Sequence, residues 1–186
     1  MRVFFAVDLP EGIRVALGEI QRDLKGVTKS ARWTDPKSIH VTLKFIGEIA
    51  GERLAAIDSA TAGLIIEPFS VSVRGIGLFP GNRSPRVFWA GLESAAMREL
   101  ANEIDARMEV IGLQREKREF RPHLTLARAR GNRFDDSLVE ASRKYANHDF
   151  GSFIVDRFYL IESFLEPTGA VYDKLRQYLL EPRSPS

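Results

Sequence analysis

A four-residue pattern occurs twice in the sequence, and this repetition constrains the fold more than any other feature. His40-Val41-Thr42-Leu43 is followed 83 residues later by His123-Leu124-Thr125-Leu126. The chain contains only three His and six Thr, so two such His-x-Thr pairs are not expected by chance. A second spacing agrees, because Val87 lies 83 residues after Phe4 at the same point of a similar apolar segment. The sequence therefore predicts an internal duplication.

The order of predicted elements repeats together with the motif. Apolar residues that cluster, alternate or recur every three to four positions predict strand–helix–strand–helix–strand in each half. The first half has these elements at residues 2–7, 10–26, 39–46, 51–67 and 69–76, and the second half has them at 86–91, 94–111, 123–127, 136–145 and 153–161. A last helix is predicted over residues 171–180.

Strands that are mixed with helices in this order predict an α+β fold. We expect a single domain over residues 1–186, with two lobes related by a pseudo-two-fold axis and the active cleft between them. The lobes cover approximately residues 1–78 and 85–165, each with an antiparallel-rich sheet and helices, and residues 166–186 form a C-terminal segment. The loop at residues 78–85 carries the Pro and Gly expected of a junction.

The spacing within each motif has a physical meaning on a β-strand. Residues i and i+2 point to the same side of a strand. Each motif therefore presents one imidazole and one hydroxyl to the same face and buries its two apolar residues on the other. If a two-fold axis relates the two strands, two imidazoles and two hydroxyls can surround a single anion.

This set of groups suits phosphoryl transfer. Displacement at phosphorus needs a base for the entering oxygen and an acid for the leaving oxygen. Imidazole can serve either role because its reference pKa is about 6.5, and Thr hydroxyls can donate to phosphate oxygens. We predict His40 and His123 as catalytic residues and Thr42 and Thr125 as phosphate ligands, with no metal and no other cofactor. The residues alone do not decide which His is the acid.

A metal site is the competing interpretation of the histidines. His148 would have to join His40 and His123 as a third ligand. It lies in the polar turn Ala146-Asn147-His148-Asp149, outside the repeat, and neither motif carries an acidic residue two or four positions after its His. Thr is also a poor zinc ligand. The sequence therefore favours a site without metal and an exposed His148.

Composition excludes several other classes of protein. Hydrophobic residues make up 44% of the chain and charged residues 28%, and no apolar run is long enough to span a membrane. The apolar stretch at residues 3–7 runs directly into Asp8, so we do not expect a signal peptide. Cys is absent, which excludes disulfides and fits a cytoplasmic location. The net charge of +2 permits an anionic partner.

Both motifs resemble the signature of the 2H phosphoesterase superfamily, and the wider context is similar to the RNA 2′,3′-cyclic phosphodiesterases, also called the 2′-5′ RNA ligase family. The resembling segments span nearly the whole chain. They are Arg2-Val3-Phe4-Phe5-Ala6, Ile39-His40-Val41-Thr42-Leu43-Lys44-Phe45-Ile46-Gly47-Glu48, Gly77-Leu78-Phe79-Pro80, Val87-Phe88-Trp89-Ala90-Gly91-Leu92, Phe120-Arg121-Pro122-His123-Leu124-Thr125-Leu126-Ala127-Arg128, and Leu160-Ile161-Glu162-Ser163 with Gly169 and Tyr172.

The resemblance implies a bilobal α+β fold and metal-independent hydrolysis of a 2′,3′-cyclic phosphate at an RNA 3′ end, which leaves a 2′-phosphate. It implies that His40 donates a proton to the leaving 3′ oxygen and that His123 accepts a proton from water. Thr42 and Thr125 would hold the phosphate. The same reaction run backwards implies a weak 2′-5′ RNA ligase activity.

Four further residues are candidates for contact with RNA. Lys44 either adds positive charge to the face of the first motif or lies in solvent at the end of its strand. Arg121 precedes the second motif and could steer the RNA backbone. Arg128 falls on the opposite side of its strand from the motif residues unless the strand ends or bulges there. Phe120 could stack on a terminal base, whereas Phe45 is expected in the core.

The expected partner is RNA that ends in a 2′,3′-cyclic phosphate, of which tRNA fragments are one example, and we expect a monomer with no membrane association. Seven basic residues against two acidic ones between residues 115 and 133 indicate either a surface for an anion or a solvated face. Two other functions stay open: an RNA-binding module without chemistry, and a phosphoesterase for a small cyclic nucleotide. Paired imidazoles argue against the first, because binding alone needs cations.

Overall fold

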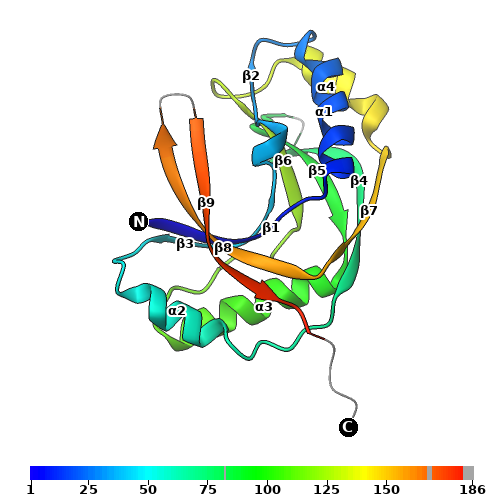
Figure 1. The fold of residues 1–186 in the computed structure, drawn as a ribbon. Coiled ribbons are helices and arrows are strands. Elements are labelled where there is room, and N and C mark those ends of the chain that lie inside the picture. Colours follow the sequence, from blue (N-terminus) through cyan, green and yellow to red (C-terminus); the bar gives the residue numbers. More distant parts are fainter. Residues whose placement is uncertain (82, 167–168, 182–186) are drawn as a thin grey trace.

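The computed structural model describes residues 1–81, 83–166 and 169–181, and within them the strands form two antiparallel sheets (Figure 1). The strands are β1 (Arg2–Val7), β2 (Ala31–Trp33), β3 (Val41–Glu48), β4 (Phe69–Phe79), β5 (Val87–Glu93), β6 (His123–Ala129), β7 (Asp149–Val155), β8 (Arg157–Glu166) and β9 (Gly169–Leu179). The four-stranded sheet has the order β3-β1-β8-β9 and the five-stranded sheet the order β2-β6-β5-β4-β7. The predicted α+β class with antiparallel sheets is confirmed.

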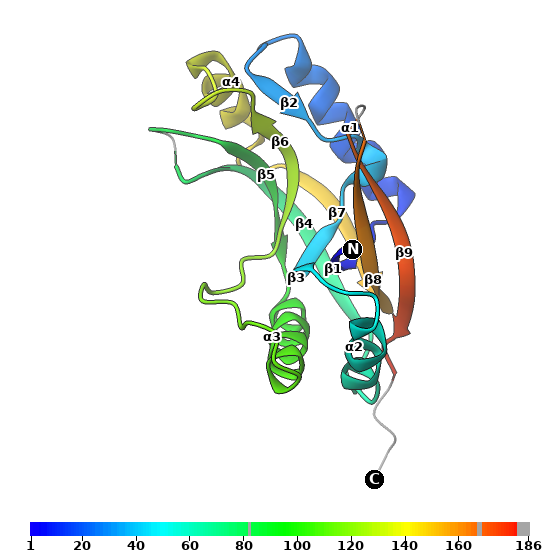
Figure 2. The same cartoon turned by 90° about the vertical axis from the view of Figure 1, so that its left-hand side faces the viewer.

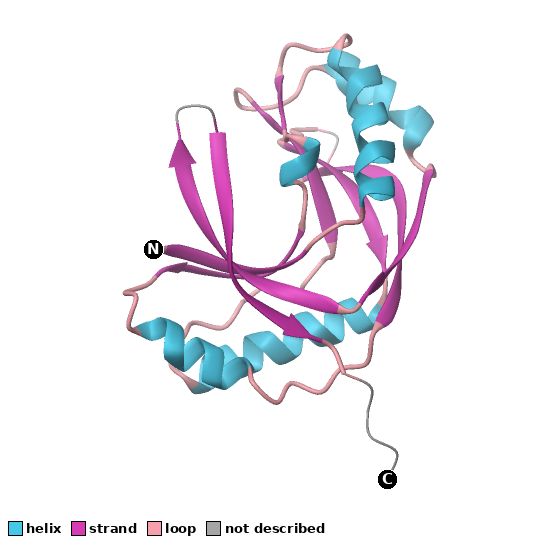
Figure 3. Ribbon diagram, viewed as in Figure 1, coloured by secondary structure: helices cyan, strands magenta, loops and turns pink. Residues whose placement is uncertain are grey.

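The α-helices of the described residues form two pairs at opposite ends of the molecule (Figure 3). One pair is α1 (Glu11–Lys25) with α4 (Asp136–Ser142), and the other is α2 (Arg53–Thr61) with α3 (Ala95–Val110); η1 (Pro36–Ser38) and η2 (Arg143–Tyr145) are 3-10 turns. The predicted apolar stripe of α1 is buried, at Ile13, Leu17, Ile20 and Leu24. None of the helices in the described part of the chain is long and apolar enough to cross a lipid bilayer.

The two halves of the sequence are interleaved in the fold. β1 pairs with β3 and β8, whereas β5 pairs with β6 and β4. The last strand of each half therefore crosses to the sheet of the other half, and neither sheet is built from one half alone. Figure 2 shows β4, β5 and β6 on one side of the molecule and β8 and β9 on the other, with β1 and β3 between them. The lobe boundaries near residues 78–85 stay a prediction.

The strand of the first motif, β3, contains a β-bulge directly after its Thr. Thr42 pairs with Ala6, but Lys44 pairs with the next residue of β1, Phe5. Leu43 is therefore an extra residue without a partner position on β1. A bulge reverses the alternation of the residues that follow it, so Leu43 and Lys44 both point into the core, with 4% and 2% of their surface exposed.

The strand of the second motif, β6, contains a bulge at the equivalent position. Thr125 pairs with Trp89, but Ala127 pairs with Phe88, so that Leu126 is the extra residue. Leu126 and Ala127 are both fully buried. The two bulges lie 83 residues apart, which is the spacing of the two motifs.

β1 is buried on both of its faces. Phe5 belongs to the main core, which contains residues of both sheets and the helices. Phe4 and Ala6 point the other way and pack with Ile161 in a separate small cluster. This second cluster forms the floor of the face on which the first motif lies.

The prediction of a helix over residues 171–180 is wrong, because this segment forms β9, antiparallel to β8. Tyr172, Leu175 and Tyr178 are half-buried at a spacing of three, which imitates a helical period. A bulge at Leu175 produces this spacing. Tyr172 lies beside His40, whereas Tyr178 packs against the main core. Pairing with β8 outweighs local helix propensity here.

Three other boundaries differ from the predictions. The strand predicted over residues 153–161 is two strands, β7 and β8, which lie in different sheets and are separated by Asp156. The helix predicted over residues 51–67 ends at Thr61, because Gly63 adopts a φ of 70°, the left-handed conformation that terminates helices. The sequence does not predict the three-residue strand β2, since so short a strand has no readable period.

Candidate active site

His40 and His123 are held in the same way. His40 Nδ1 is 2.9 Å from the carbonyl oxygen of Ser38, and His123 Nδ1 is 2.8 Å from the carbonyl oxygen of Arg121. A carbonyl only accepts, so Nδ1 is the protonated nitrogen in both rings and donates to it. Both Nε2 atoms are therefore left for a ligand, which they can meet as acceptors when neutral or as donors when protonated.

The two imidazoles have different surroundings. The ring of His40 stacks on Phe4, with 4.9 Å between ring centroids, and meets the ring of Tyr172 edge-on at 5.1 Å. The ring of His123 meets Phe79 edge-on at 5.5 Å. The hydrogen bond of His40 is partly buried, whereas that of His123 is exposed.

Burial lowers the pKa of His40 below its ordinary value, because apolar surroundings penalise the imidazolium more than the neutral ring. The hydrogen bond to Ser38 and the negative charge of Asp8 act in the opposite direction, and the positive charge of Arg14 adds to the lowering. The surroundings of His40 in the free protein therefore favour the neutral ring.

The two Thr residues lie on the motif faces of their strands. Thr125 pairs with Trp89 and His123 with Gly91, so both motif residues share one face of β6. Thr42 pairs with Ala6. Ala6 lies on the same face of β1 as Phe4, whose ring stacks on His40. Within the described residues neither Thr hydroxyl has a hydrogen-bond partner, so both are available to a ligand.

The two motif strands approach each other although they belong to different sheets. Cα atoms of β3 and β6 come within 8 Å of one another. Burial raises the pKa of Tyr172 on β9, and the positive charge of Arg128 on β6 opposes that rise. Since the ring of Tyr172 contacts His40, the motif face of one sheet lies within electrostatic reach of the motif face of the other.

The bulge in β6 brings Arg128 to the face of the second motif. Beyond Leu126 the alternation is reversed, so that Ala127 is buried and Arg128 is exposed on the same side as His123 and Thr125. The sequence placed Arg128 on the opposite side unless the strand bulged there, and it does bulge.

The bulge in β3 removes Lys44 from the candidates for RNA contact. Lys44 is 2% exposed. Its Nζ lies 2.5 Å from a carboxylate oxygen of Asp105 and donates to the carbonyl of Gln114 at 2.8 Å. The ammonium therefore adds no charge to the face of the first motif. Instead it ties β3 to α3 and to the loop that leads to His123.

The same bulge places Phe45 on the motif face, where the expectation of a core residue is wrong. Phe45 pairs with Phe4, and their ring centroids are 5.7 Å apart. The side chain of Phe45 is 56% exposed. A row of aromatic rings therefore continues from His40 across the buried Phe4 to the exposed Phe45.

The remaining candidates lie on the approach to the second motif. Arg121 is exposed, and its guanidinium has no partner among the described residues. Phe120 is half-buried and packs against the main core. His148 is exposed as predicted, and two strands, β5 and β4, separate its end of the sheet from β6. In the described part of the chain, no group of three His, Cys, Asp or Glu side chains is close enough to hold a metal ion.

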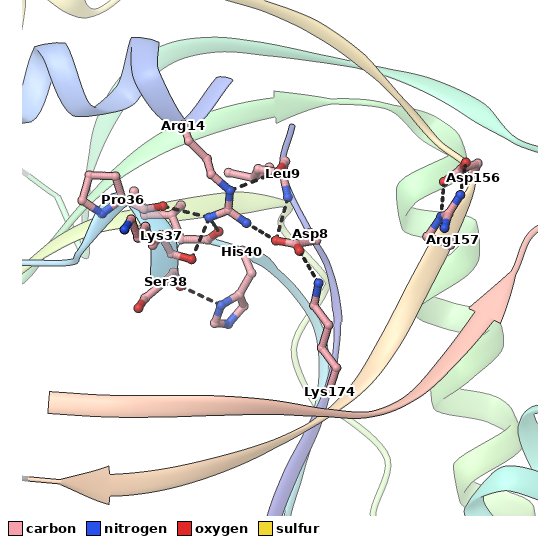
Figure 4. A network of polar contacts seen from close by, with 11 residues as sticks. Asp8, Leu9, Arg14, Pro36, Lys37, Ser38, His40, Asp156, Arg157 and Lys174 are labelled. Carbon is pink, nitrogen blue, oxygen red and sulfur yellow. Dashed lines mark hydrogen bonds and ion pairs between the residues drawn. The ribbon is translucent and has the colours of Figure 1, made fainter. Parts of the chain in front are cut away.

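Several residues around the imidazoles were missed from the sequence. Tyr172 was assigned to a helix, and Phe4 was treated only as part of a buried strand. Arg14 lies on a helix, and Figure 4 shows it reaching the turn before His40. Alternation along β1 could have identified Phe4, because one face of that strand must turn away from the main core. No local signal identifies Arg14.

Phe79 is positioned by a stack of aromatic rings on the second sheet. Its ring lies parallel to that of Trp89, with 5.0 Å between the centroids. Gly77 makes room for this stack, since a Cβ atom there would lie 2.0 Å from the indole ring. Gly77 and Phe79 both belong to the segment that carries the family resemblance. Phe79 lies beside His123, and the Trp89 ring on which it stacks occupies the space that a side chain at Gly77 would need.

The strands β3 and β6 each carry an imidazole and a hydroxyl without a hydrogen-bond partner among the described residues, which agrees with the resemblance of the sequence to the 2H phosphoesterases. The family model described as “LigT like Phosphoesterase” matches residues 7–89 and 92–172. The chain therefore belongs to the LigT-like phosphoesterase family.

Individual relatives match this chain over nearly their full lengths. An Archaeoglobus fulgidus protein named RNA 2′,3′-cyclic phosphodiesterase is 36% identical, over 96% of this chain and 99% of that protein. The crystal structure of TT0787 of Thermus thermophilus matches with a TM-score of 0.83 and 31% identity, over 99% of this chain and 100% of that one. Escherichia coli LigT complexed with 3′-AMP matches with a TM-score of 0.80 and 25% identity, over 97% and 98%.

The surroundings of His40 predict a change in its pKa when one aromatic neighbour is removed. Tyr172→Ala is expected to raise the pKa of His40 toward the ordinary value of about 6.5, because water that reaches the ring stabilises the imidazolium. An NMR titration of the imidazole signals measures this directly. Val171→Ala, which shortens an exposed neighbour on β9, should leave the pKa unchanged. A pKa of His40 at or above 6.5 in the unaltered protein would contradict burial as the cause.

The buried pair of Lys44 and Asp105 predicts a loss of stability. Lys44→Met keeps the packing but leaves the carboxylate of Asp105 without its ammonium, and we expect the free energy of unfolding to fall by about 3 kcal/mol. Urea denaturation measures the change. Lys117 is exposed in the loop between α3 and β6, and Lys117→Met should cost less than about 0.5 kcal/mol. Equal effects of the two substitutions would show that the pair does not support the fold.

Proposed function

We propose that this enzyme hydrolyses 2′,3′-cyclic phosphate at RNA 3′ ends and leaves a 2′-phosphate, without a metal or other cofactor. The observation that carries the proposal is the matched pair of imidazoles, whose Nδ1 atoms both bind backbone carbonyls and whose Nε2 atoms are both available. The names of the relatives support RNA as the substrate, and the 3′-AMP complex of LigT supports a nucleotide at this site.

In the proposed mechanism the two imidazoles act on opposite sides of phosphorus. His123 Nε2 takes a proton from water as the water oxygen attacks phosphorus. His40 Nε2 gives its proton to the 3′ oxygen as the bond between phosphorus and that oxygen breaks. One P–O bond forms and one breaks, and the phosphate stays on the 2′ oxygen. The assignment of acid to His40 and base to His123 follows the family resemblance.

The proton donor must be protonated before the reaction, whereas burial lowers the pKa of His40 in the free protein. A cyclic phosphate carries one negative charge. A negative charge within about 4–6 Å of an imidazole favours the imidazolium. We therefore expect bound substrate to raise the pKa of His40 and so to create the acid that the reaction needs.

The remaining polar groups bind the phosphate and the chain that carries it. The hydroxyls of Thr42 and Thr125 donate to the non-bridging oxygens, which gain negative charge in the transition state. Arg128 supplies a positive charge on the same face as the second motif. Arg121 and Phe120 contact the RNA beyond the terminal nucleotide, by charge and by stacking respectively.

A 2′-5′ RNA ligase activity follows if a 5′-hydroxyl takes the place of water: its oxygen attacks the cyclic phosphate, the bond to the 3′ oxygen breaks, and the two RNAs are joined through a 2′-5′ bond. We expect this ligation to be weak in dilute solution, where water is the more abundant nucleophile. The proposed partner is RNA with a 2′,3′-cyclic phosphate end, including tRNA fragments, and the proposed active unit is a monomer formed by one domain.

The test of this function is incubation with an RNA that ends in a 2′,3′-cyclic phosphate, in the presence of excess EDTA. We expect a 2′-phosphate product, resolved chromatographically from the 3′-phosphate isomer. A 3′-phosphate product, or loss of turnover in EDTA, would contradict the mechanism. A 2′,3′-cyclic mononucleotide serves as the second substrate, and a preference for it over RNA would favour the small cyclic nucleotide as the true substrate.

Substitution of each catalytic His tests the two-imidazole mechanism. His40→Ala and His123→Ala are each expected to lower turnover by about 10²–10⁴-fold, the usual contribution of general acid–base catalysis. His148→Ala is the matched control, since this exposed His lies outside both motifs, and it should keep full activity. Near-normal turnover in either motif variant, with the fold intact by circular dichroism, would refute the proposed roles.

A further inference from the structure

The guanidinium of Arg14 on α1 forms hydrogen bonds to the backbone of the turn that precedes His40 (Figure 4). The two N–H groups of its Nη1 are shared among the carbonyl oxygens of Pro36, Lys37 and Ile39, which lie 2.8, 2.8 and 3.1 Å from the nitrogen. The side chain of Arg14 is 12% exposed; its bonds to Pro36 and Ile39 are partly buried, whereas its bond to Lys37 is exposed. One side chain thus holds three carbonyls of a four-residue segment.

The fourth carbonyl of this segment belongs to Ser38, and it points to His40. Its oxygen accepts from His40 Nδ1 at 2.9 Å. Because Arg14 turns the carbonyls on both sides of Ser38 toward itself, the peptide of Ser38 has one orientation left. The contacts of Arg14 therefore determine where the acceptor for Nδ1 lies, and with it the tautomer and the direction of Nε2.

The structure assigns Arg14 as a positioning residue for His40, an inference that rests on the proposed function of His40 in phosphoester hydrolysis. The hydrogen bonds of Arg14 go to backbone carbonyls, Asp8 and Leu9 rather than to the imidazole, on whose pKa Arg14 acts only through its charge. It acts through the Pro36–Ser38 turn by fixing the carbonyl that holds the catalytic ring. A displacement of about 1 Å in such a group can cost about 10²-fold in rate, so the position of a single carbonyl matters.

The same guanidinium is anchored to the end of β1 and, through it, to β9. Nε donates to the carbonyl of Leu9 at 3.1 Å, and Nη2 forms an ion pair with Asp8. The second oxygen of Asp8 accepts from Lys174 at 2.6 Å. Lys174 is two residues from Tyr172, whose ring contacts His40. The network therefore positions the imidazole from two sides, through the turn and through β9.

The contacts require a guanidinium rather than any cation. Arg presents five N–H donors in a planar fork, whereas the ammonium of Lys presents three donors around one point. Among the described residues no arginine holds the loop before His123 in this way. At the 83-residue spacing of the repeat, Met97 takes the place of Arg14, and the loop is held instead by Asp105, which accepts from the backbone N–H of Glu116.

Arg14→Met and Arg14→Lys test the inference with two readouts. In ¹⁵N-detected imidazole spectra, we expect Arg14→Met to convert His40 from the Nδ1–H form to a mixture of tautomers, while His123 in the same spectrum stays unchanged. With cyclic-phosphate RNA, we expect kcat to fall by about 10²-fold and KM to change by less than about threefold. Arg14→Lys should lose about tenfold in kcat, and it remains informative if Arg14→Met does not fold.

The matched control is Arg107→Met. Arg107 also donates to three carbonyls, those of Ala60, Ala62 and Gly63, and pairs with Glu103, all outside both motifs. We expect a comparable loss in thermal stability but unchanged kcat and an unchanged His40 tautomer. An unchanged His40 tautomer in both Arg14 variants, or an equal loss of kcat in Arg107→Met, would overturn the inference. If the unaltered protein does not cleave the RNA, the proposed function fails while the spectra still test the positioning role.

Discussion

The extra residue in each motif strand determines what the two motif faces contain. A β-bulge places two residues of one strand opposite one residue of its partner, so every later side chain changes sides. The bulges at Leu43 and Leu126 therefore bury Lys44, which regular alternation would have exposed beside the first motif. They also bring out Phe45 on one strand and Arg128 on the other. One repeated backbone irregularity thus yields an aromatic surface on one motif face and a cation on the other.

The helices hold these irregular strands with buried polar groups, and each helix holds the motif strand of the other half. Gln21 on α1 donates to the carbonyl of Leu126, the bulged residue of β6, at 2.9 Å. Asp105 on α3 binds Lys44, the residue after the bulge of β3. The carbonyl of Leu126 also accepts from the backbone N–H of Thr34 at 2.9 Å, whereas Lys44 is held through its side chain. Each half therefore holds the motif strand of the other near its bulge, in one case by an amide hydrogen bond and in the other by an ion pair.

The sequence was sufficient for features that depend on local spacing and insufficient for those that depend on pairing between distant strands. The His-x-Thr spacing predicted which motif side chains share a face, and the apolar stripe of α1 predicted its buried side. A bulge is a mismatch between two strands, so neither strand alone reveals it, and Lys44 and Phe45 were misplaced for this reason. The segment around Tyr172 imitates a helical period because β9 also contains a bulge, at Leu175. Arg14 was missed because its acceptors are backbone carbonyls more than 20 residues away.

The repeated motif gives His40 and His123 the same local sequence, but the residues around the two imidazoles differ. Both rings have the same tautomer, so tautomer alone assigns neither acid nor base. His40 lies between Phe4 and Tyr172, where loss of hydration destabilises the imidazolium and lowers the pKa of the ring. The nearby charges of Asp8 and Arg14 act on this pKa in opposite directions. Under the proposed roles, a bound phosphate adds a negative charge that favours the protonated ring. Proton uptake by His40 and substrate binding then strengthen each other, so the phosphoester itself promotes the acid form of the half-buried histidine that is needed to cleave it.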